Sequence, residues 1–204
     1  MAVISFASDR YRLRLTLDNP LPQPGEGRSA RAFDRYLAEL VRDDDRVCAF
    51  LDVYLRRLEA ERVSYIRAAA ALGSEFLVRV CLEALTGDGD VQEYVEATFE
   101  DAMTDVYVFD ELHVVDSDAE RPVLRGIFMQ ELMSVLSHGL DVFFINARDD
   151  EFQFWRDTLG ARRVGHFIAA SGARPLPIYP RRSGRRPVRQ APPRLRVLGR
   201  REPN

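Results

Sequence analysis

Two polar side chains near the end of an apolar segment have the residue types that proton transfer needs. The segment VYVFDELHVV at 106–115 is rich in β-branched and aromatic residues, as a central strand is, and it carries Glu111 and His113. Their spacing of two places both side chains on one face of such a strand. A histidine titrates near neutrality and can act as a general base, whereas a single histidine on a strand is more often structural.

Metal binding and membrane insertion are not indicated by the sequence. Cys48, Cys81 and the three histidines show no ligand spacing, so we expect free, buried thiols in a reducing compartment. No apolar run approaches the roughly 20 residues of a membrane-spanning helix. The first residues, MAVISFASDR, lack the basic start and apolar stretch of a secretory signal. These features predict a cytoplasmic protein without a membrane partner.

Hydrophobic spacing predicts the elements of the first half of the chain. With 204 residues, 46% of them hydrophobic and 30% charged, the chain is long enough for one folded domain. Alternation over 4–17 predicts a strand, which the prolines of 19–25 end. Apolar residues at helical spacing predict one helix over 29–41 and a second over 43–73.

The stretch 75–99 fits a helix or a hairpin by spacing alone. Its FLVRVCLEAL segment also alternates, and the GDGD at 87–90 carries an Asp-Gly turn signal, so we expect a hairpin.

The second half predicts a crossover unit. A helix at 122–138 and a buried strand at 140–147 follow the strand at 106–115, which implies a parallel strand pair. A short helix at 151–160 comes next. One or two terminal strands, in RRVGHFIAA and LPIY, complete the order.

Two segments of this half share their pattern with a known family. DELHVVDSDAERPVLRGIFMQELMSVL has a strand ending in an acidic residue and an arginine- and glycine-containing turn into a helix. DVFFINARDDEFQFWRDTLGARRVG has a strand, a small-polar loop and an aromatic-rich helix that ends in Leu-Gly. Both resemble the GNAT superfamily of acyl-CoA-dependent N-acyltransferases, over 106–170. The resemblance implies an α/β (α+β) fold with a mixed central sheet, flanking helices and a parallel, splayed strand pair.

The resemblance also implies a phosphate site at the turn into the helix. In the family, a glycine-rich turn lets backbone N–H groups close on the pyrophosphate of the acyl-CoA. With the family's glycine placed on Gly126, Val123 and Phe128 stand where a basic or amide residue and a small residue belong. Arg121 and Arg125 can supply charge to a phosphate, and Phe128 is better explained as a core residue.

Further roles follow from the same resemblance. The family's usual glutamate base corresponds to His113, with Glu111 beside it, and its tyrosine acid corresponds to Arg156, next to Trp155. The first parallel strand would pair with the pantetheine arm of acetyl-CoA, and a side-chain donor would stand on the opposite wall. These positions are Leu112, Val114 and Val115 on the first strand and Asn146 on the wall, although Asn146 could equally cap the next helix.

Charge separates the end of the chain from the rest. Residues 181–204 hold nine arginines against the single Glu202 and are rich in Pro and Gly, whereas 1–180 are acidic. Such a tail is expected to be extended and to contact nucleic acid or an acidic partner, or only to aid solubility. All 29 basic residues are arginine, which genome composition or avoidance of self-acylation would explain.

Together these features predict a GNAT-like domain at 1–180 and a basic tail at 181–204. The expected function is acyl-CoA-dependent N-acyltransfer, with acetyl-CoA as donor and an amine of unknown identity as acceptor. The alternative is a catalytically degenerate GNAT-like binding or regulatory module, which contacts nucleic acid or an acidic partner through the tail.

Overall fold

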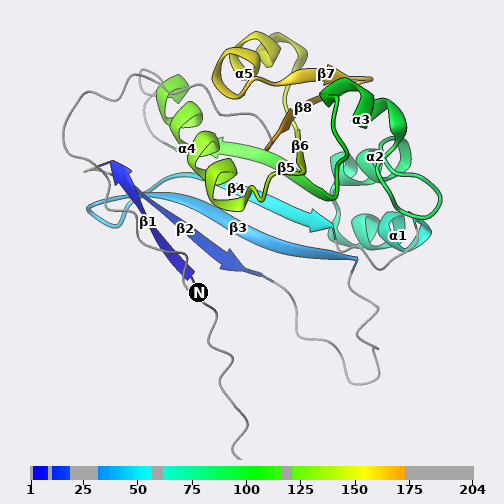
Figure 1. Cartoon of the computed structure of the whole chain (residues 1–204). Helices are drawn as coiled ribbons and strands as arrows, with labels where there is room; N and C mark the ends of the chain where they lie inside the picture. Colours follow the sequence, from blue (N-terminus) through cyan, green and yellow to red (C-terminus); the bar gives the residue numbers. More distant parts are fainter. Residues whose placement is uncertain (1, 9–10, 19–31, 57–61, 116–120, 173–204) are drawn as a thin grey trace, which may run out of the picture.

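A mixed sheet with helices on both faces organises the chain (Figure 1). The computed structural model describes residues 2–8, 11–18, 32–56, 62–115 and 121–172. The strands are β1 (Ala2–Ser8), β2 (Tyr11–Leu17), β3 (Phe33–Arg42), β4 (Val47–Arg56), β5 (Asp105–Val114), β6 (Asp141–Ile145), β7 (Arg162–Val164) and β8 (Phe167–Ser171). The helices are α1 (Arg62–Leu72), α2 (Glu75–Glu83), α3 (Glu93–Phe99), α4 (Arg121–Leu136) and α5 (Phe152–Leu159), the last preceded by a 3-10 turn at Asp149–Glu151.

The eight strands lie in the order β1-β2-β3-β4-β5-β6-β8-β7. Every neighbouring pair is antiparallel except β5 and β6, which are parallel and joined through α4. The described residues therefore form a mixed α/β sheet with one parallel pair, which confirms the mixed sheet, the crossover and the parallel pair predicted from the sequence.

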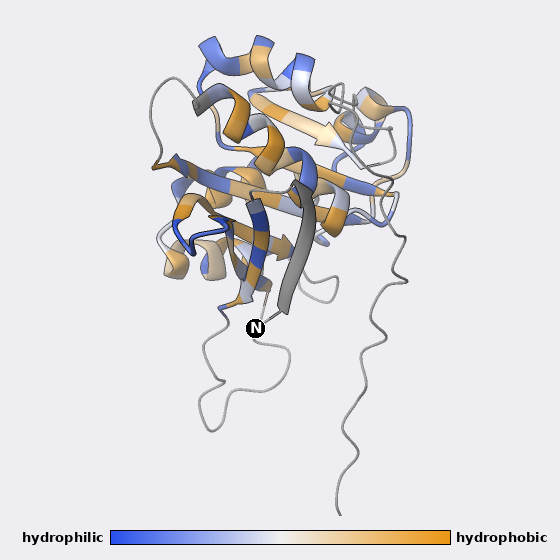
Figure 2. Ribbon diagram, turned by 90° about the vertical axis from the view of Figure 1, so that its left-hand side faces the viewer, coloured by the Kyte–Doolittle hydropathy of each residue, from blue (hydrophilic) through white to orange (hydrophobic). Residues whose placement is uncertain are grey.

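Two cores form because the central strands bury both of their faces. Val106 and Val108 of β5 pack with α1, α2 and α3, whereas Tyr107 and Phe109 pack with α4 and α5. Figure 2 shows the apolar residues of the helices turned toward the sheet and the hydrophilic ones turned outward. Phe128 is fully buried in the core under α4, in agreement with its interpretation as a core residue.

The two helices predicted over 29–41 and 43–73 are wrong for most of their length. The chain forms the hairpin of β3 and β4 there, and among the residues of this stretch that the structure describes, only Arg62–Leu72 is helical. The acidic run 43–45 is the turn of this hairpin, in which Asp45 adopts a left-handed conformation with φ of 64°. Asp tolerates this conformation better than most residues. On β4, burial on both faces removed the alternation that identifies a strand.

The hairpin predicted over 75–99 is also wrong, although its turn exists. Two helices, α2 and α3, occupy the stretch, and Leu85 and Val91 form a single antiparallel bridge across the turn. Phe76, Leu77 and Val80 are buried at helical spacing, and Ser74 caps the helix by accepting a hydrogen bond from the Leu77 amide at 3.0 Å.

The remaining elements follow the sequence predictions closely. The helix predicted at 122–138, the strand at 140–147 and the helix at 151–160 are α4, β6 and α5. The strand predicted over 4–17 is two antiparallel strands, β1 and β2. LPIY and the segment 181–204 lie outside the described residues. Within the described ranges, none of the helices has the length and apolar character that crossing a membrane requires.

Candidate functional site

The pairing of the parallel strands β5 and β6 ends partway along β5. Their pairing runs from Asp105 opposite Asp141 to Phe109 opposite Ile145, and the amide of Asn146 then donates to the Phe109 carbonyl at 2.8 Å. β6 ends there, whereas β5 continues alongside β4 to Val114. The carboxyl ends of parallel strands are where open α/β sheets bind ligands.

A bulge interrupts the pairing of β5 with β4 directly after the pairing of β5 with β6 ends. Asp52 of β4 lies opposite Asp110, and Phe50 lies opposite His113, so β5 has one residue more than β4 in this interval. Glu111, inside the bulge, has a φ of 43°. We call residues 112–115, beyond the bulge, the β5 arm.

Two residues of the β5 arm direct their backbone N–H and C=O groups away from β4, toward the side of β5 on which β6 has ended. The Val115 amide donates to the carbonyl of Cys48, near the start of β4, at 2.8 Å, so its backbone faces β4. Backbone groups alternate in direction along a strand. The N–H and C=O groups of Leu112 and Val114 therefore face away from β4, while Val115, predicted to contact the same ligand, does not share this direction.

Glu111 and His113 lie together on the sheet face that also carries Phe50. The Nε2 atom of His113 is 3.3 Å from Oε2 of Glu111, and the imidazole stacks on the Phe50 ring with centroids 4.7 Å apart. Half of the His113 side chain is exposed, as is 73% of the Glu111 side chain. An exposed imidazole held by a carboxylate on one nitrogen can accept a proton on the other.

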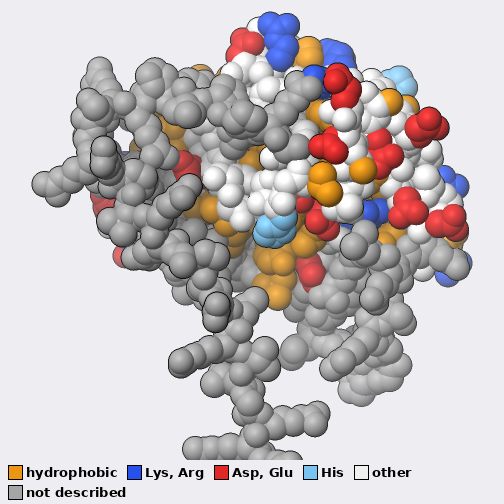
Figure 3. Space-filling model, in the orientation of Figure 1, with side chains coloured by type: hydrophobic (Ala, Val, Ile, Leu, Met, Phe, Trp, Pro, Cys, Tyr) orange, Lys and Arg blue, Asp and Glu red, His pale blue; other side chains and the backbone are white. Residues whose placement is uncertain are grey.

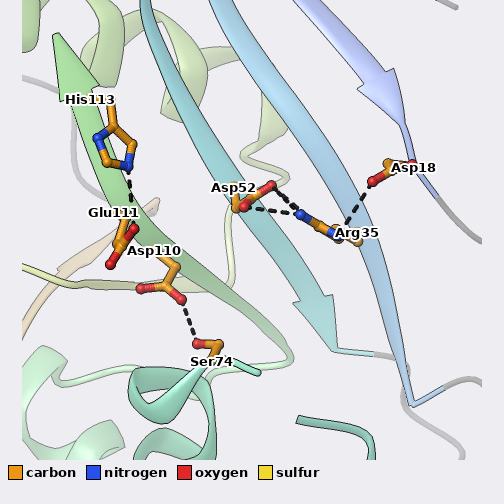
Figure 4. Close-up of polar contacts among 7 residues, drawn as sticks. All are labelled: Asp18, Arg35, Asp52, Ser74, Asp110, Glu111 and His113. Carbon is orange, nitrogen blue, oxygen red and sulfur yellow. Dashed lines mark hydrogen bonds and ion pairs between the residues drawn. The ribbon is translucent and has the colours of Figure 1, made fainter. Parts of the chain in front are cut away.

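Asp110 is a buried carboxylate that joins three elements where the pairing of β5 with β6 ends. It is 8% exposed. Its Oδ1 accepts from Nδ2 of Asn146 at 2.6 Å. Its Oδ2 accepts from the hydroxyl of Ser74, the cap of α2, as Figure 4 shows. Asn146 thus donates to Asp110, and the cap of the following 3-10 turn is Arg148 rather than Asn146.

The neighbouring strands continue the polar surface. Arg35 of β3 pairs with Asp52 of β4 at 3.2 Å and with Asp18 after β2 at 3.4 Å (Figure 4). The hydrogen bond to Asp52 raises the pKa of Arg35. Tyr54 lies two residues after Asp52 on β4 and is buried. Burial together with the Asp52 charge raises the pKa of Tyr54 to about 12. The phenol therefore stays protonated at physiological pH.

The residues predicted to hold a pyrophosphate are placed at the start of α4. Because α4 begins at Arg121, Gly126 lies in its second turn, beyond the first four N–H groups that a helix leaves unpaired. Arg125 pairs with Glu151 at 2.6 Å, and its guanidinium lies over the Trp155 ring. Val123 is 62% exposed on the helix surface.

The position corresponding to the family's tyrosine acid lies on α5. Arg156 is exposed beside Asp157, and Trp155 is 1% exposed in the core with its indole N–H unpaired within the described residues. Trp155 belongs to the core cluster against which Leu112 and Val114 of the β5 arm also pack. Cys48 and Cys81 are buried free thiols, and in the described parts of the chain no group of three or more His, Cys, Asp and Glu side chains could hold a metal.

Asp110, Ser74 and the Arg35–Asp52 pair were missed by the sequence analysis. Asp110 had one available signal, a charged residue in the middle of an otherwise apolar strand segment. Ser74 and Asn146 are each 36 residues away from it in sequence, so that spacing alone could not connect them.

Comparison with models of protein families, with curated proteins and with solved structures found no match.

Proposed function

We propose that this chain has a GNAT-like fold and transfers an acyl group, acetyl in the simplest case, from coenzyme A to an amine. The observation that carries the proposal is that the pairing of β5 with β6 ends after Phe109, while β5 continues with the backbone of Leu112 and Val114 directed away from β4. The order of the strands in the sheet supports it. Four antiparallel pairs from β1 to β5 lead to the parallel pair of β5 and β6, and β8 and β7 then follow as an antiparallel hairpin.

The β5 arm suits a pantetheine chain for a physical reason. Pantetheine carries two amide groups in an extended chain, and an extended amide chain can pair with an unoccupied strand edge as another strand would. Leu112 and Val114 offer this edge, and a carrier seated there brings its thioester close to Glu111 and His113.

The reaction needs a base near the acceptor nitrogen. The amine attacks the thioester carbonyl, the C–N bond forms, the C–S bond breaks, and the amine loses one proton as coenzyme A leaves as a thiolate that is protonated by water. In our proposal Glu111 holds the Nε2 proton of His113, and Nδ1 of His113 accepts the amine proton. The hydrogen bond to Glu111 and the stacking on Phe50 keep the imidazole in place.

Phosphate binding would differ from the family pattern. In the proposed complex, the pyrophosphate contacts the free amides of the first turn of α4 and the charge of Arg121, since Gly126 is inside the helix and Arg125 is engaged by Glu151. Pro122 supplies no N–H group to this turn.

This departure favours a second candidate function, ligand binding without turnover. In that case the GNAT-like body is a degenerate binding or regulatory module, and the tail at 181–204 contacts nucleic acid or an acidic partner. The engagement of Arg125 and the exposed Val123 at the start of α4 are the observations behind this alternative.

Calorimetric titration with acetyl-CoA, followed by an assay of coenzyme A release with a panel of amines, separates the two functions. We expect binding by the wild type and by His113→Gln, and a loss of turnover of about 100-fold or more in His113→Gln. His138→Gln, which changes an exposed histidine after α4, is the matched control and should keep full activity.

Binding without turnover by the wild type would favour the degenerate module. The absence of any heat at high acetyl-CoA concentration would contradict both the transferase and an acyl-CoA-binding module.

A further inference from the structure

Asp110 lies where the pairing of β5 with β6 ends. The backbone hydrogen bond from the Asn146 amide to the Phe109 carbonyl follows the last register pair, Phe109 and Ile145, and the next link is the hydrogen bond from the Asn146 side chain to Asp110. The following residue, Glu111, starts the bulge. The direction of the β5 arm is therefore set within one residue of this carboxylate.

The second oxygen of Asp110 fixes the carboxylate from the other side. It accepts from the Ser74 hydroxyl, which itself accepts from the Leu77 amide at 3.0 Å in the first turn of α2. The positive end of a helix favours a nearby anion, and hydrogen bonds to an ionised carboxylate are stronger than neutral ones. The buried carboxylate thus links α2, β5 and the end of β6.

A second buried carboxylate marks the opposite end of the same strand pair. Asp141 is fully buried at the start of β6, and its Oδ2 accepts from the Ser137 hydroxyl at 2.9 Å and from the Gly139 amide at 3.0 Å. Next to it, the Thr104 amide donates to the Leu140 carbonyl at 2.8 Å. Asp141 is buried as Asp110 is, but its Oδ1 has no partner within the described residues and it lies away from the bulge.

We propose that Asp110 is a positioning residue, which holds the β5 arm at a fixed angle to β6 and so sets the geometry of the Glu111–His113 pair. This inference deepens and partly rests on the proposed function, since the β5 arm is the edge assigned to the acyl carrier. Without the carboxylate, Asn146 and Ser74 lose their shared acceptor, and the arm loses its side-chain link to α2 and to the end of β6.

Amide hydrogen exchange on the full chain tests the inference without any ligand. The Val115 amide, bonded to the Cys48 carbonyl, reports on the β5 arm, and the Thr104 amide reports on the opposite end of the strand pair. In Asp110→Ala we expect exchange at Val115 to accelerate about tenfold or more relative to Thr104, because buried partners are left unpaired. In Asp141→Ala we expect exchange at Thr104 to accelerate more than exchange at Val115.

Asp110→Asn provides the rescue, because its amide oxygen can still accept from Asn146. It should keep the protection of Val115 close to that of the wild type. Equal acceleration at Val115 in Asp110→Ala and Asp141→Ala, or none in Asp110→Ala, would overturn the inference.

Acetyl-CoA titration of the same variants separates this inference from the proposed function. If the wild type binds, Asp110→Ala should weaken binding about tenfold or more, and Asp141→Ala should change it less. If the wild type does not bind, the proposed function fails, whereas the exchange result still decides whether Asp110 positions the arm.

Discussion

At the scale of single residues, burial keeps a thiol and two phenols neutral. Burial raises the pKa of Cys81, on α2, to about 12 and that of Tyr54, on β4, to about 12, and it also raises the pKa of Tyr107. In the unfolded chain these groups lose their protons near their ordinary values. Their contribution to stability is therefore complete below about pH 9 and is lost as the pH rises toward the folded-state values.

The free energy of unfolding should accordingly fall as the solution becomes alkaline. For Cys81, with an ordinary pKa of 9.0, the loss between pH 8 and about pH 10.5 amounts to about 2 kcal/mol, since each pH unit above the unfolded pKa contributes about 1.4 kcal/mol. Cys81→Ala should remove this part of the pH dependence. Urea denaturation of both proteins at the two pH values measures it, and equal slopes in the two would contradict the prediction.

Residue spacing predicted one contact of the candidate site and missed another. A period of two along 106–115 brought Glu111 and His113 together, and they are in contact in the structure even though a bulge interrupts the strand between them. Asp110 could not be placed in the same way, because its partners Ser74 and Asn146 come from α2 and from the end of β6. Such contacts depend on tertiary packing rather than on local periodicity.

At the scale of elements, the end of α5 at Gly160 is an example of a backbone conformation that the sequence itself indicates. Gly160 closes α5 in the left-handed conformation with φ of 68°, and a Cβ built there meets nothing within 4 Å. A substitution would thus be opposed by backbone strain alone. This helix and its end were predicted correctly, because a glycine after an apolar helix is a strong local signal.

Gly160→Ala should lower the free energy of unfolding by about 1 kcal/mol, the usual difference between glycine and alanine in this conformation. Gly87→Ala is the matched control, since Gly87 also has open space around it but lies outside the left-handed region. Thermal or chemical denaturation gives both values. A similar effect at the two glycines would show that strain at Gly160 is not the cause.

The hairpin of β3 and β4 shows where local signals mislead. A helical stripe is formed by Phe33, Leu37 and Leu40 when the segment is drawn as a helix. In β3, however, the face that packs under α4 decides which residues are fully buried, and Ala38 is one of them. Pairing with β2 and β4 decides the conformation of this segment, and pairing partners cannot be read from a single segment. Tertiary context overrides the local preference there.

At the scale of the whole molecule, charge is divided between the folded body and the end of the chain. Exposed carboxylates gather on and after α3, at Glu93, Glu100 and Asp101, and Figure 3 shows acidic side chains spread over that side of the surface. The segment 181–204 carries nine arginines against Glu202. Opposite charges on one chain favour salt-dependent contacts with acidic partners or with nucleic acid through the basic segment.

Removal of 181–204 should therefore abolish salt-dependent binding to a single-stranded RNA probe, if the full chain shows such binding. The shortened chain should keep the thermal stability of the body, since the described elements end at Ser171. Fluorescence anisotropy at low and high salt measures the first effect. Binding that persists after the deletion would assign it to the folded body.

The three helices inserted between β4 and β5 have a consequence for the order of folding. β3 and β4 are joined by a turn of a few residues and can associate early, whereas β5 reaches β4 only after a connection of about fifty residues has closed, at a considerable entropic cost. We therefore expect the strand that carries Asp110, Glu111 and His113 to dock late. A ribosome-bound chain that stops before β5 would expose the apolar side of β4, and the pairing that forms the β5 arm awaits synthesis of the second half.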